Sequence, residues 1–129
     1  MNFKDYNQHQ LFLFPPTFED LIPEHHPVRI VNDVIDKIKI DPLLKAYKKE
    51  GNPSYHPKMM LKIMIYAYMD NTYSSRRIEK SVKENVNFMW LSGMKQVDHN
   101  TISRFRSQKL KDAFKDIFRQ VVLLLAEEV

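Results

Sequence analysis

The sequence predicts an all-α protein, and three observations indicate this fold class. Glycine occurs only twice in 129 residues. Apolar residues recur at spacings of three and four along most of the chain, which is the period of an amphipathic helix. No segment shows the sustained alternation of apolar and polar residues that predicts a β-strand. We therefore expect one small multi-helix domain of five to seven helices that contains a helix-turn-helix-like unit.

The N-terminal part should consist of an arm followed by two helices. Residues 1–26 are expected to form an irregular arm, because they contain several prolines and aromatic residues. A helix should begin at Pro27, whose fixed φ suits a first helical turn, and a helical domain should extend from there over residues 27–129. A second, short helix should begin at Asp41-Pro42, and Gly51 can close it.

The most apolar segment of the chain follows Pro57 and should form the central helix. Residues 57–71 are apolar on nearly all sides, which is typical of a helix that is covered all round. Ser74 and Ser75 can cap the next helix, and a last helix is expected over residues 111–129. The residues that we expect to be buried together are Ile63, Ile78, Trp90, Ile102 and Phe105.

Residues 85–110 have the order helix, turn containing a glycine, helix, which is the order of a helix-turn-helix. Asp98, Asn100 and Thr101 have side-chain oxygens that can accept the free N–H groups at the start of the second helix. Two helices joined by a short turn are common in helical proteins. The order alone is therefore compatible with helix-turn-helix and other helical folds.

The second helix of this unit has one apolar and one polar side. At about 100° per residue, Ile102 and Phe105 fall on the inner side. The outer side carries groups that can hydrogen-bond base edges in a major groove, as a recognition helix requires. A solvated helix face is the alternative interpretation. The candidates for base contacts are Asn100, Ser103, Arg104, Ser107 and Gln108.

Positive charge is concentrated around this helix. Residues 74–119 hold eleven Lys/Arg and five Asp/Glu, whereas residues 1–73 hold nine of each. A basic segment beside a neutral one favours a polyanionic partner, and phosphate attraction is the sequence-independent part of DNA affinity. An ordinary solvated surface fits the charge alone equally well. The candidates for phosphate contacts are Arg76, Arg77, Lys80, Lys83, Thr101 and Arg106.

Several other classes of site lack support in the sequence. There is no cysteine, which excludes disulfides and thiolate metal sites. No signal peptide is visible, and no apolar run approaches the ~20 residues of a membrane span. Adjacent His25 and His26 lack the spacing of helical metal ligands. We assign no catalytic residue, metal, cofactor, small-molecule substrate or membrane contact to this chain. The expected partner is double-stranded DNA, and the chain could also form a homodimer.

Collinear motifs run through nearly the whole chain, from about Gln10 to the last helix. Together they resemble the N-terminal domain of bacterial insertion-sequence transposases of the DDE class. In that family an apolar stretch precedes a Leu-Ile/Val-Pro-Glu-x-His-x-x-Arg motif. The matching positions are Leu21-Ile22-Pro23-Glu24, His26, Arg29, Tyr55, Pro57, Met60-Leu61, Tyr66, Ser74-Ser75-Arg76-Arg77-Ile78-Glu79, Glu84-Asn85, Trp90-Leu91, Gly93, Asp98, Thr101-Ile102 and Arg104-Phe105-Arg106.

The resemblance implies a DNA-binding domain that recognises transposon ends for DNA transposition in the bacterial cytoplasm, close to the nucleoid. In the family, a catalytic domain of ribonuclease-H-like fold follows, and its Asp, Asp and Glu bind two divalent metal ions. We expect that domain to be absent from residues 1–129 and the chain to be non-catalytic by itself. The alternatives are a protein-interaction or dimerisation module, or a free-standing helix-turn-helix transcriptional regulator, which would not explain the upstream motifs.

The resemblance also concerns the N-terminal segment. It implies that Glu24, His26 and Arg29 form a structural cluster at a helix start. The apolar residues 11–14 lie in an otherwise polar arm. We expect them to dock back onto the helical core, and a docking surface for the catalytic domain is the alternative.

Overall fold

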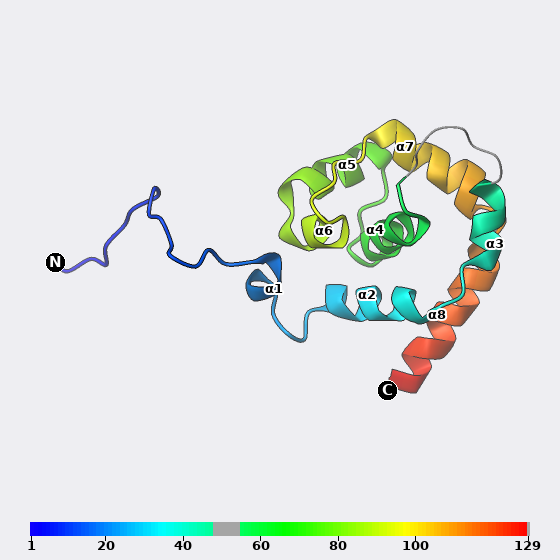
Figure 1. The fold of residues 1–129 in the computed structure, drawn as a ribbon, viewed down its shortest axis with the longest axis horizontal. Helices are drawn as coiled ribbons and strands as arrows, with labels where there is room; N and C mark the ends of the chain where they lie inside the picture. The colour runs from blue at the N-terminus through cyan, green and yellow to red at the C-terminus, as the bar shows by residue number, and fades with distance from the viewer. Residues whose placement is uncertain (48–54, 129) are drawn as a thin grey trace.

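The computed structural model describes residues 1–47 and 55–128, and within them every regular element is helical (Figure 1). The all-α prediction is confirmed. A 3₁₀ turn follows α3, and a π turn continues α7. The elements are α1 (Phe18–Leu21), α2 (Pro27–Lys37), α3 (Asp41–Leu44), η1 (Lys45–Tyr47), α4 (Pro57–Met69), α5 (Ser75–Glu84), α6 (Val86–Leu91), α7 (His99–Arg104), η2 (Phe105–Leu110) and α8 (Phe114–Glu128).

The expected number of five to seven helices is too low, because the described residues contain eight α-helices. The additional one is α1, a single turn within the stretch that was expected to be irregular. Thr17 starts it: its side chain accepts a hydrogen bond from the Asp20 N–H at 3.3 Å, and the Asp20 carboxylate accepts one from the Thr17 N–H at 3.0 Å. This reciprocal pair satisfies two N–H groups that a helix start leaves free.

Prolines and histidines set the starts of the two longest helices in the first half of the chain. Pro27 and Pro57 are the first residues of α2 and α4, as predicted. His26 and His56 precede them, and each Nδ1 accepts a hydrogen bond at 3.0 Å from the N–H two residues later. Histidine caps were not predicted from the sequence. The expected end of the short helix at Gly51 lies outside the described residues.

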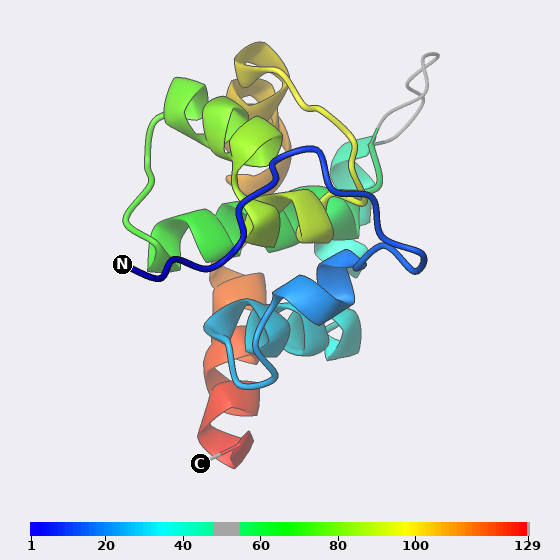
Figure 2. The same ribbon diagram turned by 90° about the vertical axis from the view of Figure 1, so that its left-hand side faces the viewer.

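Helix α4 occupies the centre of the molecule, as its all-round apolar sequence predicts. Figures 1 and 2 show α2 on one side of it and α5 and α7 on the opposite side, with α6 beside it. Helix α8 packs against α2 and ends away from the other helices. None of the helices in the described parts of the chain is long and apolar enough to cross a membrane. The buried residues of α4 are Met60, Leu61, Ile63, Met64, Ile65, Tyr66 and Ala67.

The predicted core is correct except at Trp90. Ile63, Ile78, Ile102 and Phe105 are all buried, but Trp90 is only partly buried. The fully buried aromatic residue of α6 is Phe88 instead. Because Phe88 and Leu91 lie three residues apart on α6, they share its inner face, and Trp90 falls on the flank. There its indole N–H donates to the Glu19 carboxylate at 3.0 Å, which satisfies the polar edge of the ring.

The helical order expected over residues 85–110 is present, but the packing differs from the prediction. Helix α7 packs chiefly against α5 rather than against α6, so Trp90 does not lie under Ile102. The connection between α6 and α7 turns at Gly93 and Met94, whose φ angles are 59° and 69°. A glycine adopts such a conformation without steric cost, whereas methionine does not. Helices α5, α6 and α7 therefore form a three-helix unit with α5 as the support of α7.

The N-terminal arm extends away from the helices (Figure 1). Residues 1–17 are all exposed, and Leu11, Phe12, Leu13 and Phe14 are 92%, 60%, 89% and 85% exposed. The expectation that residues 11–14 dock back onto the core is therefore wrong. The prolines at positions 15 and 16 favour an extended backbone, which directs the arm outward from α1.

Candidate nucleic-acid interface

The start of α7 is fixed by Asp98. Its carboxylate Oδ1 accepts a hydrogen bond from the Thr101 N–H at 3.2 Å and another from the Thr101 hydroxyl. These bonds lower the pKa of Asp98, the bond from the Thr101 side chain having the largest effect. Of the three capping candidates, Asp98 is thus the one that caps the helix. The hydroxyl proton of Thr101, a candidate for phosphate contact, is used within the protein.

Helix α5 holds the first residue of α7 through Glu79. The Glu79 carboxylate Oε1 accepts a hydrogen bond from the His99 backbone N–H at 3.0 Å, and His99 Nδ1 lies 3.3 Å from the same oxygen. These bonds lower the pKa of Glu79 below its ordinary value, with the backbone bond having the largest effect and the charge of Lys83 contributing. This pair was not predicted from the sequence. Its only signal was the presence of Glu79 in one of the family motifs.

Acid should weaken the contact between α5 and α7. A carboxylate whose pKa is lowered by folding stabilises the protein fully above its ordinary pKa, near 4.5 for Glu79. That contribution is lost as the pH falls below this value through the lower pKa of the folded state. We expect Glu79→Gln to be less stable than wild type at neutral pH, and the difference to shrink in acid. Denaturant titrations at a series of pH values measure this.

Glu84 is an exposed glutamate on the same helix and provides the matched control. Glu84→Gln should stay close to wild type over the whole pH range. If the stability difference between Glu79→Gln and wild type is the same at neutral and acidic pH, the ionised carboxylate does not hold α7.

All five candidates for base contacts lie on the exposed side of α7 and η2, as predicted. The inner side of the same helix is held by Ile102, Phe105 and Leu110, which are buried. Among the outer residues, the Ser107 hydroxyl donates to the Ser103 carbonyl oxygen at 3.0 Å, so its proton is already bound. Asn100, Ser103, Arg104, Ser107 and Gln108 thus form one exposed polar face on an anchored helix.

Arg106 and Lys109 fasten the inner edge of this helix to other parts of the molecule. Arg106 Nη2 donates to the Tyr73 carbonyl oxygen at 2.7 Å, and its guanidinium lies 6.0 Å from the centre of the Tyr68 ring. Arg106 Nε is buried and has no hydrogen-bond partner among the described residues. Lys109 Nζ donates to the Ala46 carbonyl oxygen at 2.8 Å. Arg106, a candidate for phosphate contact, is thus partly buried and already bound to another part of the protein.

The four basic candidates on α5 are exposed, as predicted, but their side chains point in different directions around the helix. At about 100° per residue, Arg76 and Lys83 lie close to the direction of Glu79, which contacts α7. Arg77 lies on the far side. Lys80 lies between these two sides, on the outer surface. Arg77 and Lys80 line a surface hollow of about 430 Å³ together with Ser81, Glu84 and Asn85.

Arg29, the arginine of the N-terminal motif, joins α1 to the start of α2. Arg29 Nη1 donates a hydrogen bond to the Glu19 carboxylate at 2.7 Å. Its Nη2 donates to two backbone carbonyl oxygens, that of Glu19 at 2.7 Å and that of Ile22 at 2.8 Å. Its Nε donates to the Pro23 carbonyl oxygen at 3.0 Å. The guanidinium also lies 5.4 Å from the centre of the Trp90 ring. The bond from Arg29 lowers the pKa of Glu19. We call these five residues the Arg29 cluster.

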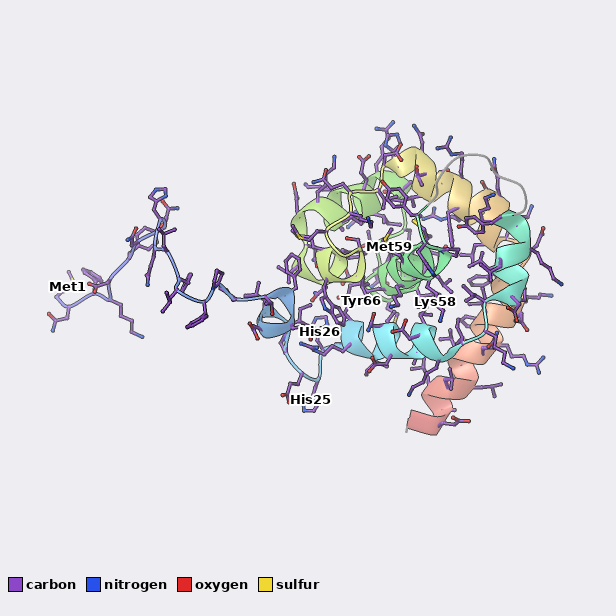
Figure 3. The ribbon with its side chains drawn as sticks, viewed as in Figure 1. Met1, His25, His26, Lys58, Met59 and Tyr66 are labelled. Carbon is purple, nitrogen blue, oxygen red and sulfur yellow. The ribbon has the colours of Figure 1, made fainter. Side chains whose placement is uncertain are left out.

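The cluster implied by the resemblance is therefore correct in two of its three members. Arg29 and His26 both organise the start of α2, but the carboxylate bound by Arg29 belongs to Glu19, and Glu24 is exposed. Figure 3 shows His26 turned toward Tyr66 and His25 pointing away from the helices. Nowhere in residues 1–47 and 55–128 do three or more His, Asp or Glu gather closely enough to hold a metal ion.

Comparison with known proteins adds one finding. A family model described as "Transposase domain (DUF772)" matches residues 16–108, a stretch that contains the Arg29 cluster, all of α5 and α7, and most of η2. No curated protein and no solved structure matches the chain.

Proposed function

The chain belongs to the transposase domain family, and on this premise we propose that it binds double-stranded DNA at transposon ends through α7 and η2. The observation that carries the proposal is the exposed polar face of this helix. Asn100, Arg104 and Gln108 carry the amide and guanidinium groups that make bidentate contacts to base edges. Ile102 and Phe105 hold the opposite side in the core, which gives the helix a fixed orientation.

Helix α5 supplies the phosphate contacts in this proposal. Base contacts specify a sequence, whereas phosphate contacts position the protein on the duplex. Arg76 and Lys83 lie toward α7, and Lys80 lies on the outer surface beside them, so a duplex bound to α7 would pass close to all three. Thr101 and Arg106 have a structural role instead, which their bonds to Asp98 and to the Tyr73 carbonyl support. We assign no step of the transposition chemistry to this chain.

A duplex-binding assay with two variants tests the proposal. Arg104→Ala should lose about 1–3 kcal/mol of binding free energy at the preferred site and relax the preference at one base position. Lys80→Ala should weaken binding to preferred and scrambled duplexes alike. It should also reduce the slope of log affinity against log salt concentration by about one, as expected for the loss of one phosphate contact. The preferred site is obtained by selection from a pool of randomised duplexes. Affinity is then measured at two salt concentrations.

Arg119→Ala is the matched control, since Arg119 is an exposed arginine on α8, outside the proposed interface. It removes the same charge and should leave base preference unchanged. If Arg104→Ala and Lys80→Ala both bind DNA like wild type while circular dichroism shows an intact fold, this helix does not bind DNA. The exposed apolar residues 11–14 would then favour the interaction module, because exposed apolar segments mark protein contacts.

A further inference from the structure

The second half of the proposed recognition helix is a π turn. The helix continues from Arg104 into η2 without a break, and the residues flanking η2 have right-handed helical angles. A π turn contains more residues than an α turn, since each N–H bonds to the carbonyl five residues earlier. Phe105 and Leu110 are five residues apart, and both are buried, with 3% and 2% exposure. In a straight α-helix they would point about 140° apart.

The π turn also changes the outer face. In a straight α-helix each step of four residues drifts by about 40°, so Gln108 would point about 80° away from Asn100. Because residues of a π turn rotate less per residue, Gln108 turns back toward the direction of Asn100 and Arg104. By this geometry the three side chains project within about 40° of one another around the helix axis, and Ser103 and Ser107 lie to one side of them.

We propose that the π turn aligns Asn100, Arg104 and Gln108 into a single base-contacting row, an inference that rests on the proposed DNA-binding function. The row is at most about 12 Å long, from eight residues at about 1.5 Å each. That length corresponds to three or four base pairs at about 3.4 Å per step. The row contacts a block of adjacent base pairs in one major groove. Gln108 determines which base is preferred at one end of that block.

Two side chains hold the π turn in place. Arg106 attaches it to the segment between α4 and α5 through the Tyr73 carbonyl. Lys109 attaches it to η1, where its ammonium donates to the Ala46 carbonyl and lies 4.8 Å from the centre of the Tyr47 ring. Lys109 is a positioning residue in this scheme, since it faces the protein and acts on base preference through the direction of Gln108.

Selection from a randomised duplex pool, carried out with each variant of the full chain, tests the row. Asn100→Ala, Arg104→Ala and Gln108→Ala should each lose about 5- to 150-fold of discrimination, at three different positions of one adjacent block. Arg119→Ala should keep the wild-type preference, because Arg119 is exposed on α8, outside the proposed interface. Circular dichroism checks that each exposed substitution leaves the fold intact.

The two possible failures differ. If Gln108→Ala keeps the full preference while Arg104→Ala loses it, the row is wrong and the proposed function stands. If none of the three alanine variants changes the selected site, the proposed function itself fails. Lys109→Met keeps the aliphatic stem and removes the ammonium, and it should relax the preference at the Gln108 position more than at the Asn100 position. An equal effect at both positions would overturn the positioning role of Lys109.

Discussion

Phe88→Ala should lower the free energy of unfolding by about 3–5 kcal/mol, the range measured when a buried phenylalanine is truncated. Phe88 is fully buried, and its ring meets that of Tyr66 edge to face at a centroid distance of 5.0 Å. The substitution would leave a cavity between α4 and α6. Trp90→Ala should cost less, although tryptophan is the larger side chain, because Trp90 lies partly exposed on the flank of α6. Denaturant unfolding followed by far-ultraviolet circular dichroism compares the two.

Phe88→Leu controls for the cavity, since it keeps a large apolar side chain and should cost less than Phe88→Ala. A larger loss for Trp90→Ala than for Phe88→Ala would contradict the structure and place the indole in the core. Native fluorescence offers a second measurement, because Trp90 is the sole tryptophan. Its emission should be that of a partly exposed indole.

Local signals made the helix starts predictable. Two separate signals mark helix starts: a proline at the first helical position, as at Pro27 and Pro57, and an oxygen-bearing side chain just before that position, as at Asp98. Each acts on neighbouring residues alone, so it can be recognised without knowledge of the fold. The central position of α4 was also predictable, because a helix that is apolar on all sides requires cover on all sides. The exposure of the outer face of α7 was predictable from the helical spacing of its residues.

The features that the sequence did not reveal depend on contacts between distant segments. Helix α6 has only six residues, too few for apolar spacing to decide whether Phe88 or Trp90 faces inward. The outcome depends on Glu19, which lies 71 residues away and accepts the indole N–H. The π turn is likewise attached to remote carbonyl groups, which accept hydrogen bonds from Arg106 and Lys109. Residues 11–14 do not dock as expected, because docking requires a receiving surface on the helices and a sequence pattern does not show whether one exists.

Arg29→Met should detach α1 from the rest of the molecule. The substitution keeps a long apolar side chain but removes all donors, which leaves the carbonyls of Glu19, Ile22 and Pro23 without their partner. Hydrogen bonds from a charged donor contribute about 1.5–3 kcal/mol each when they are well shielded. Because Arg29 is partly exposed, we expect a loss of about 2–3 kcal/mol in the free energy that holds α1 in place. Amide hydrogen exchange over residues 18–23 measures it.

Trp90 reports the same event optically, because it contacts both Glu19 and Arg29. Its emission should shift to the red in Arg29→Met as α1 leaves and water reaches the indole. Arg29→Lys keeps the charge without the planar fork and should give an intermediate effect. Glu19→Gln removes one charge but leaves the three carbonyl bonds, so α1 should stay docked. If exchange over residues 18–23 in Arg29→Met equals that of wild type, then α1 is held by other contacts, and the family motif that contains Arg29 has a different purpose.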